Sequence, residues 1–324
     1  MKHPWEVFPE KFLEKLPNFT NDATKDQILN AFCHRNPPTF RANTLKISPE
    51  ELQKNLQEIG IETERVSWYK DAFILKNVPQ KVLTDTQFYK DGYFYVQSLS
   101  SMIPPLVLDP QPNERILDLT AAPGSKTTQI AALMQNTGEV VANDKSRIRM
   151  YKLEANLKIQ GVTNVKTSFI PGEVIWKRYP EYFDKTLVDV PCSMEGRFWT
   201  EDPKSYKDWT PGKVKMLSEM QKWLIRSAVS STIPGGTIVY STCTLSPEEN
   251  EGVIDWILKK EKDAIEIEEI KIPGLNLSPG ITKFGNKIYD LRLSKAARIF
   301  PSSTMEGFFV AKIRKIHSSL PDSF

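Results

Sequence analysis

The stretch from Arg115 to Thr128 constrains the fold of this chain more than any other part of the sequence. It opens with an apolar run of strand length, Ile116 to Leu119, and the pair Pro123-Gly124 then predicts a sharp turn. An apolar pattern of helical period follows from Thr127 to Met134. A strand, a turn of small residues and a helix, in that order, present backbone N–H groups to a ligand at the carboxyl end of a strand in an open α/β sheet.

The residues of this turn have little side chain, so a ligand is able to approach the backbone closely. They are Thr120, Ala121, Ala122, Gly124 and Ser125. A tight strand-to-helix connection without any ligand explains the same residues equally well, and the loop alone does not decide between the two. The loop is neither Gly-x-Gly-x-x-Gly nor a Walker loop, which weakens the case for a dinucleotide or a nucleoside triphosphate.

Composition narrows the class of protein. A chain of 324 residues with 40% hydrophobic residues buries a large core, and we expect one large domain and a smaller one. The net charge of +3 permits a polyanionic partner without demanding one. Three cysteines without a Cys-x-x-Cys spacing argue against a disulfide framework and a zinc cluster, and favour a reducing cytoplasm. The three histidines are too scattered for a Ser-His-Asp triad, and no stretch is long and apolar enough to cross a bilayer.

The first hundred residues predict a small accessory unit. Residues 1 to about 36 have helical apolar patterns, and a strand is expected at Thr39 to Lys46. Ser48-Pro49 is a helix-start signal, with Ser48 as the N-cap of a helix that runs to Gly60. Strands at 63–68 and 72–75 would complete a β-α-β-β unit.

From Gln97 onward, helices alternate with apolar strands, as a mostly parallel sheet requires. After the opening strand and loop, strands are expected at 139–142, 164–169, 186–190, 237–240, 299–300 and 307–313. Helices are expected at 146–160, from Thr210-Pro211, and from Ser246-Pro247 to about Lys260.

The second strand of this pattern ends at Asp144. An acid at that place suits hydrogen bonds to the two hydroxyls of a ribose. The alternative is a cap on the following helix, where Asp is common. We favour the ribose role because the residue accompanies the small-residue loop.

Two cysteines follow neighbouring strands. The fourth strand ends in Asp189-Val-Pro-Cys192-Ser193 and the fifth in Ser241-Thr-Cys243-Thr244, so both cysteines are expected in one crevice. Without a histidine nearby they suggest thiol chemistry, although each taken singly is also an ordinary small core residue. Cys243 comes just before the helix expected at Ser246, whose free N–H groups and dipole would lower the pKa of its thiol.

At this point the sequence resembles a known family, the AdoMet-dependent RNA cytosine-5 methyltransferases of the Sun/Nol1-related group. The resemblance rests on Thr120–Lys126, Asp189–Ser193 and Tyr240–Thr244, because a Pro-Cys and a Thr-Cys behind an Ala-Ala-Pro-Gly-x-Lys loop form a specific combination. It extends from about Phe8 to Lys315 through Arg41–Lys46, Tyr95–Met102, Pro247–Glu251 and Gly307–Val310. Within the family, the chain resembles the bacterial 16S ribosomal RNA methyltransferase F type, and then archaeal transfer-RNA enzymes.

The resemblance implies an α/β fold with a Rossmann-like class I methyltransferase domain at 98–315. An N-terminal helical plus small α+β (RRM-like) RNA-binding domain would occupy 1–97, and a C-terminal tail 316–324. The cofactor implied is S-adenosyl-L-methionine (AdoMet). The residues expected to hold it are Thr120, Ala121, Ala122, Pro123, Gly124, Ser125, Lys126, Asp144 and Asp189.

The resemblance also assigns chemistry to four side chains. C5 of cytosine is a poor nucleophile until a group adds to C6, and Cys243 would be that group. Cys192 would assist the later elimination, Asp189 would hydrogen-bond the base at N3 and N4, and Lys126 would organise the site. The base must be unstacked to reach the thiol. The expected partner is a structured RNA, ribosomal RNA favoured and transfer RNA second, with no metal, no membrane and a monomeric, cytoplasmic protein.

Two alternatives are weighed against this assignment. A DNA cytosine-5 methyltransferase places its nucleophile in the Pro-Cys sequence and carries a large recognition insertion, and the presence of Cys243 and the lack of an insertion count against it. A non-catalytic RNA-binding scaffold is disfavoured because both cysteines, Asp189 and Lys126 are intact.

One segment of the sequence departs from the family pattern, and two groups of basic residues carry further predictions. Phe169–Gly172 stands where the family often has an acid near the adenine, and Glu173 is the nearest substitute. Phosphate contacts are expected among basic residues on both flanks of the sequence: Arg35, Arg41, Lys46, Arg292, Lys295, Arg298, Arg314 and Lys315. The basic residues Lys145, Arg147, Arg149, Lys152 and Lys158 are expected on a solvent-facing helix.

Overall fold

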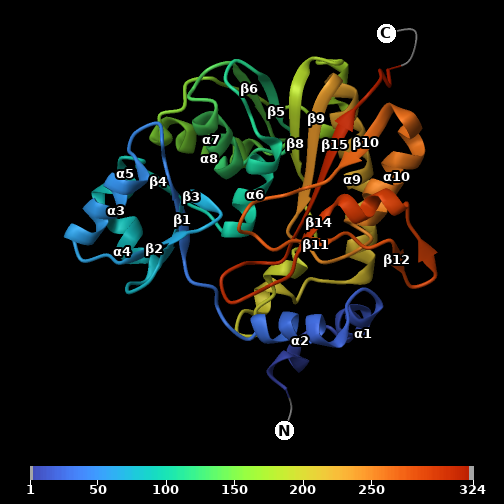
Figure 1. Cartoon of the computed structure of the whole chain (residues 1–324), viewed down its shortest axis with the longest axis horizontal. Helices are drawn as coiled ribbons and strands as arrows, with labels where there is room; N and C mark the ends of the chain where they lie inside the picture. Colours follow the sequence, from blue (N-terminus) through green and yellow to red (C-terminus); the bar gives the residue numbers. More distant parts are fainter. Residues whose placement is uncertain (1–2, 321–324) are drawn as a thin grey trace.

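The computed structural model describes residues 3–320, in which a nine-stranded sheet with helices on both faces lies beside a separate four-stranded sheet (Figure 1). Residues 1–2 of the expected N-terminal domain and 321–324 of the expected C-terminal tail lie outside the described residues. No helix within 3–320 has both the length and the apolar character needed to cross a membrane.

The chain begins with short helices, as expected, and they pack on the larger unit rather than on the small sheet (Figure 1). Asn21 caps the longest of them by accepting a hydrogen bond from the Thr24 N–H at 2.8 Å. The ring of Phe12 lies 4.9 Å from that of Phe198, which follows the fourth strand of the large sheet. These elements are η1 (Pro4–Val7), α1 (Glu10–Lys15), η2 (Leu16–Asn18) and α2 (Asp22–Ala31).

The small unit is a four-stranded antiparallel sheet in the order β2-β3-β1-β4, and the expected α+β unit with RRM-like order is confirmed. Ser48 caps its first helix by accepting from the Glu51 N–H at 3.2 Å. The first strand ends at Ala42, not at Lys46 as expected, because the carbonyl of Asn43 closes a turn by accepting from the N–H of Lys46. The elements are β1 (Thr39–Ala42), α3 (Pro49–Glu58), β2 (Thr63–Val66), β3 (Tyr69–Leu75), α4 (Gln80–Asp85), α5 (Gln87–Lys90) and β4 (Phe94–Val96).

The large sheet has the order β11-β14-β15-β9-β8-β5-β6-β7, and β10 pairs with β15. Strands β5 to β9 are parallel, and β15 is antiparallel to β9. The strands are β5 (Arg115–Asp118), β6 (Glu139–Asn143), β7 (Val165–Ser168), β8 (Phe183–Asp189), β9 (Thr232–Thr242), β10 (Ile265–Glu268), β11 (Ser278–Pro279), β14 (Ala297–Ile299) and β15 (Phe308–Lys315), with the hairpin β12 (Lys283–Phe284) and β13 (Lys287–Ile288) beside them.

The order of the parallel strands reverses at β5, since β6 and β7 continue on one side of it and β8 and β9 on the other. This confirms the expected doubly wound α/β fold. The reversal makes the carboxyl ends of β5 and β8 the switch point where such sheets bind ligands.

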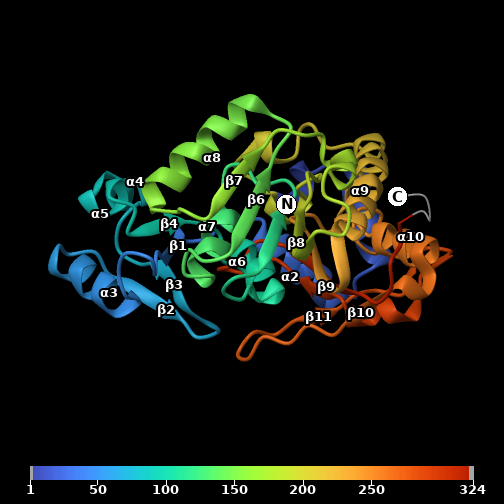
Figure 2. The same cartoon turned by 90° about the horizontal axis from the view of Figure 1, so that it is seen from above.

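Helices cover both faces of the large sheet because consecutive strand residues alternate between them. Ile116 and Leu187 face α6 and α7, whereas Leu117 and Val188 face α9 and α10. Figure 2 shows that the carboxyl end of α8 meets the small unit, and Asn43 donates there to the carbonyl of Gln160 at 2.8 Å. The helices are α6 (Leu99–Leu108), α7 (Ser125–Leu133), α8 (Arg147–Gln160), η3 (Gly172–Lys177), η4 (Glu195–Arg197), η5 (Pro203–Ser205), α9 (Pro211–Ser231), α10 (Glu251–Glu261), η6 (Lys262–Ala264) and η7 (Leu291–Lys295).

The helix expected from Ser246 begins instead at Glu251. The Ser246 hydroxyl donates to Glu195 at 2.7 Å instead of capping a helix. Glu249 turns inward, where its carboxylate accepts from the Ser193 N–H at 3.0 Å. The segment between Cys243 and α10 is therefore a buried loop held by side chains, which a capping signature alone does not reveal.

Candidate active site

The loop after β5 approaches α8 so closely that glycine is required in it. Gly124 has φ +106°, and a Cβ on it would lie 2.7 Å from Cδ1 of Leu153. Thr120 fixes the loop to the neighbouring strand by donating to the carbonyl of Asp189 at 2.7 Å. Below the loop, the buried carboxyl of Asp118 accepts from the Thr127 hydroxyl at 2.6 Å, and burial raises its pKa to about 7.

Asp144 lies at the end of β6 with its carboxylate buried. One oxygen, Oδ1, accepts from the N–H of Ser146 at 2.9 Å, and Ser146 itself caps α8. The other oxygen, Oδ2, accepts no hydrogen bond from the part of the chain that is described. Its nearest cation is Arg149, whose Nη1 is 3.3 Å away and whose Nη2 donates to the carbonyl of Ala122. Asp144 thus has an unused acceptor beside the loop and is not the helix cap.

Asp189 and Lys126, two of the residues singled out in the sequence, form an ion pair at the switch point. Lys126 Nζ lies 2.6 Å from Asp189 Oδ2 and 2.7 Å from the hydroxyl of Ser101. The other carboxylate oxygen of Asp189 accepts from the Ser241 hydroxyl at 2.7 Å. Both charged groups are therefore held in one orientation by neighbours from α6, α7 and β9.

The two cysteines also meet, because β8 and β9 are adjacent and Asp189 is in register with Ser241. Their Sγ atoms lie 3.3 Å apart, and both side chains are half-buried. The hydrogen bond with Cys243 and burial raise the pKa of Cys192 well above the usual value of a thiol. Cys33, the third cysteine, lies in the turn after α2 and is not part of this pair. Its thiol donates a hydrogen bond to the carbonyl of Leu29.

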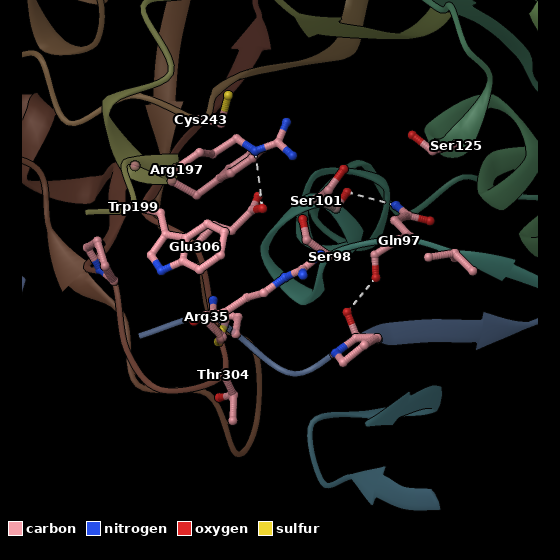
Figure 3. A pocket seen from close by; sticks show the side chains of 18 of the residues that line it. Arg35, Gln97, Ser98, Ser101, Ser125, Arg197, Trp199, Cys243, Thr304 and Glu306 are labelled. Carbon is pink, nitrogen blue, oxygen red and sulfur yellow. Dashed lines mark hydrogen bonds and ion pairs between the residues drawn. The ribbon is translucent and has the colours of Figure 1, made fainter. Parts of the chain in front are cut away.

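A cavity of about 670 Å³ joins these groups. The residues that line it include Ala122, Pro123, Ser125, Lys126, Asp189 and Cys243, and also Arg35, Gln97, Arg197, Trp199 and Glu306. Figure 3 shows Arg197 and Glu306 linked between Cys243 and Trp199, with Arg197 Nε donating to Glu306 at 3.1 Å. The volume is in the range of about 300–1,000 Å³ that ligand sites occupy.

Comparison with known proteins decides the family. Residues 105–314 match the family model described as 16S rRNA methyltransferase RsmB/F, and residues 8–99 match the N-terminal domain of 16S rRNA methyltransferase RsmF. The chain belongs to the RsmB/F methyltransferase family. The family resemblance read from the sequence motifs is thereby confirmed.

The chain covers different shares of the curated relatives that it matches. The chain is 38% identical over 321 residues to ribosomal RNA small subunit methyltransferase F of Vibrio parahaemolyticus, covering 98% of the chain and 65% of that protein. It therefore spans slightly less than two thirds of that relative. It is 42% identical over 280 residues to tRNA (cytosine(49)-C(5))-methyltransferase of Pyrococcus abyssi, covering 86% of the chain and 88% of the relative.

Solved structures agree with the fold over nearly the whole chain. A methyltransferase homologue from Pyrococcus horikoshii superposes with a TM-score of 0.84 at 34% identity and covers 96% of both chains. NSun6 from Pyrococcus horikoshii gives a TM-score of 0.82 at 27% identity and covers 96% of this chain and 99% of its own. The Rossmann-like methyltransferase fold is thus shown for this RsmB/F member.

The cofactor of a methyltransferase with this fold is AdoMet, and the residues at the switch point fit it. The unused Oδ2 of Asp144 is an acceptor for a ribose hydroxyl, which is a hydrogen-bond donor. Gly124 lets the loop pass close to Leu153 of α8, and the residues on either side of it face the cavity. Ala122, Pro123, Ser125 and Lys126 line the same cavity as Cys243.

The expected helix dipole at Cys243 is not available, because α10 starts at Glu251. Arg197 is instead a cation that interacts electrostatically with both thiols. Its pKa is raised chiefly by Glu306 and also by Cys243 and Cys192. Sequence reasoning missed Arg197, although it follows Cys192 by only five positions in a loop that had to face the crevice.

Most of the basic residues predicted to contact phosphates have other partners. The side chains of Arg41, Arg298 and Lys315 are buried. Lys46 donates to two backbone carbonyls, and Arg292 and Arg314 form ion pairs with acids on their own side of the sheet. Arg35 is the one member of the predicted set that lines the cavity. Lys145, Arg147, Arg149, Lys152 and Lys158 are exposed, as predicted, and Arg149 in addition contacts Asp144 and the loop.

Proposed function

We propose that the chain transfers a methyl group from AdoMet to C5 of a cytosine in structured RNA, with Cys243 as the covalent nucleophile. The observation that carries the proposal is that Cys243 lines the same cavity as Lys126 and Asp189, with the thiol of Cys192 lying 3.3 Å from its Sγ atom. Thr120 to Lys126, Asp144 and Asp189 would hold the cofactor. The relative from Pyrococcus abyssi is named for cytosine C5 methylation, which agrees with this chemistry.

The roles of the thiols are assigned from their positions. Cys243 lines the cavity and would attack C6 of the ring, whereas the pKa of Cys192 is raised by the hydrogen bond with Cys243 and by burial, which favours its protonated form. The electrons displaced by this attack make C5 nucleophilic. Bound AdoMet supplies the electrophilic methyl group that C5 needs. A base such as a water molecule then takes the C5 proton, the electron pair of that C–H bond re-forms the C5–C6 double bond, and the C6–S electron pair leaves with Sγ of Cys243. Cys192, whose thiol is 3.3 Å from that Sγ atom, would assist this departure by hydrogen bonding to the leaving sulfur.

Asp189 and Lys126 would orient the base. The carboxylate of Asp189 is fixed on one side by Lys126 and on the other by Ser241, so its remaining acceptor capacity points to a definite place. That geometry suits a hydrogen bond from the exocyclic amine of cytosine, which distinguishes it from uracil. The ion pair with Lys126 holds one oxygen of the carboxylate in place.

The substrate we favour is ribosomal RNA, with transfer RNA second, and we place the protein in the cytoplasm as a monomer. Residues 1–97 would serve as the RNA-binding unit and 98–315 as the catalytic unit. Relatives that the chain matches are named for both kinds of RNA.

The test is methyl transfer from labelled AdoMet to small ribosomal subunits and to transfer RNA that lack the modification, followed by nucleoside analysis. We expect label in 5-methylcytidine with the native chain and with Cys33→Ser, and none with Cys243→Ser. Bisulfite sequencing of total RNA with and without the gene would then locate the cytidine. Label in any other nucleoside, or full activity in Cys243→Ser, would contradict the proposal.

A further inference from the structure

An arginine and a tryptophan lie against each other in the wall of the active-site cavity. Trp199 follows β8 in the loop before α9, and Arg35 follows α2 in the segment before the small sheet. The guanidinium carbon of Arg35 is 5.6 Å from the centroid of the indole ring. Both residues line the cavity that Cys243 lines (Figure 3).

The polar groups of this pair are unused. Within residues 3–320, the exposed guanidinium of Arg35 makes no hydrogen bond or ion pair, and the indole N–H of Trp199 donates to no group. The neighbouring Arg197, in contrast, is tied to Glu306. A free cation and a half-exposed aromatic face are therefore available to a ligand in the cavity.

The pair is nevertheless held in place by the backbone on each side. The N–H of Trp199 donates to the hydroxyl of Ser205 at 3.1 Å. The N–H of the next residue, Thr200, donates to the carbonyl of Phe32 at 3.0 Å, which joins the Trp199 loop to the end of α2 three residues before Arg35. The stacking surface is thus preorganised, and a ligand does not have to order it.

We propose that Trp199 and Arg35 form a subsite for the nucleotide next to the target cytosine, with its base stacked on the indole and its phosphate on the guanidinium. The inference rests on the proposed function, because it requires RNA in the cavity. When the target cytosine is flipped out of the base stack, the adjacent base loses its stacking partner. An aromatic face replaces that partner for any base, and an arginine beside it adds a charge contact to the backbone.

The chain supplies a matched control for this subsite. On α9, Arg226 lies 5.7 Å from the ring centroid of Trp223, which is also half-exposed. Neither residue of this second pair lines the cavity. Substitutions in the two pairs remove the same chemical groups, one inside the cavity and one outside it.

The experiment measures binding of a dye-labelled single-stranded RNA of five nucleotides, one cytidine flanked by adenosines, to the full chain. We expect Trp199→Ala to weaken binding by about 5- to 100-fold and Trp199→Phe to retain most of it. Arg35→Gln should weaken binding and lower the slope of log affinity against log salt by about one. Trp223→Ala and Arg226→Gln should bind as the native chain does.

Equal affinity for Trp199→Phe, Trp199→Ala and the native chain would overturn the subsite, as would an equal loss in Trp223→Ala. A melting curve for each variant identifies any that fail to fold, and Trp199→Phe and Arg35→Gln keep the test open in that case. Failure of the proposed function has a different signature. Trp199-dependent RNA binding without any 5-methylcytidine would leave the subsite standing, and methyl transfer with Trp199-independent binding would leave the function standing.

Discussion

Replacing Asp118 with Asn should make the protein more stable, and by an amount that grows with pH. Asp118 lies under the cofactor loop with 1% of its surface exposed, and burial is the main reason that its pKa rises from 3.8 to about 7. Below pH 4 the carboxyl is neutral in both the folded and the unfolded chain and contributes no difference. Between pH 4 and 7 the folded chain binds the proton more tightly, so stability falls as pH rises, and above pH 7 the full cost is present.

The magnitude follows from the pKa change. A rise of about three pKa units corresponds to about 4 kcal/mol, at about 1.4 kcal/mol for each unit. Asn has nearly the same shape, accepts the same hydrogen bond from Thr127 and does not ionise. Asp118→Asn is therefore expected to match the native chain at pH 4, to exceed it by about 2 kcal/mol near pH 5.5, and by about 4 kcal/mol at pH 8.

The assay is urea unfolding of both proteins at several pH values between 4 and 8, in the same buffer series. Taking the difference between the two proteins cancels the contribution of other groups, such as Glu249, whose pKa burial also raises to about 7. If the difference in free energy of unfolding between the two proteins stays constant across this range, or if the native chain is the more stable one at pH 8, the reasoning is refuted. Ionisation of the buried Asp118 carboxyl would then not destabilise the fold.

Three further substitutions test the contacts around the site. Lys126→Met removes the partner 2.6 Å from Asp189 and should lower kcat/KM for methyl transfer by about 10- to 100-fold without lowering the melting temperature greatly. Arg41→Met removes the hydrogen bonds that the buried guanidinium donates to Gln97, Ser125 and Thr128, and should lower the free energy of unfolding by about 3 kcal/mol in urea titration. Arg298→Met isolates the buried carboxylate of Glu251 and should cost about 3–5 kcal/mol, most of which the double variant with Glu251→Leu regains; an additive loss in that double variant would contradict the assignment of a buried ion pair.

The positions of several switch-point residues could be predicted from the sequence because the signals are local or depend only on strand order. The small-residue turn at Gly124 and the acid at Asp144 each follow a strand directly, so their place at the sheet edge is fixed by the parallel order. Cys192 and Cys243 meet for the same reason, since each follows one of two neighbouring strands by a few residues.

What the sequence did not predict depends on contacts between distant segments. Ser246 has the composition of a helix cap, but its hydroxyl bonds Glu195, 51 positions away, and the helix starts later. Arg298 and Lys315 carry the charge expected of phosphate contacts, yet tertiary partners bury them. Arg35 and Trp199 meet only because α2 packs on the loop before α9.

The most direct test of the central claim is to identify the residue that bonds to the base. Cys192→Ser, incubated with AdoMet and a methyl-accepting RNA, is expected to accumulate a protein–RNA complex that survives denaturation. After nuclease and protease digestion, mass spectrometry should find the modified pyrimidine on Cys243. A nucleotide on Cys192 in the Cys243→Ser variant, with no complex in Cys192→Ser, would contradict the account.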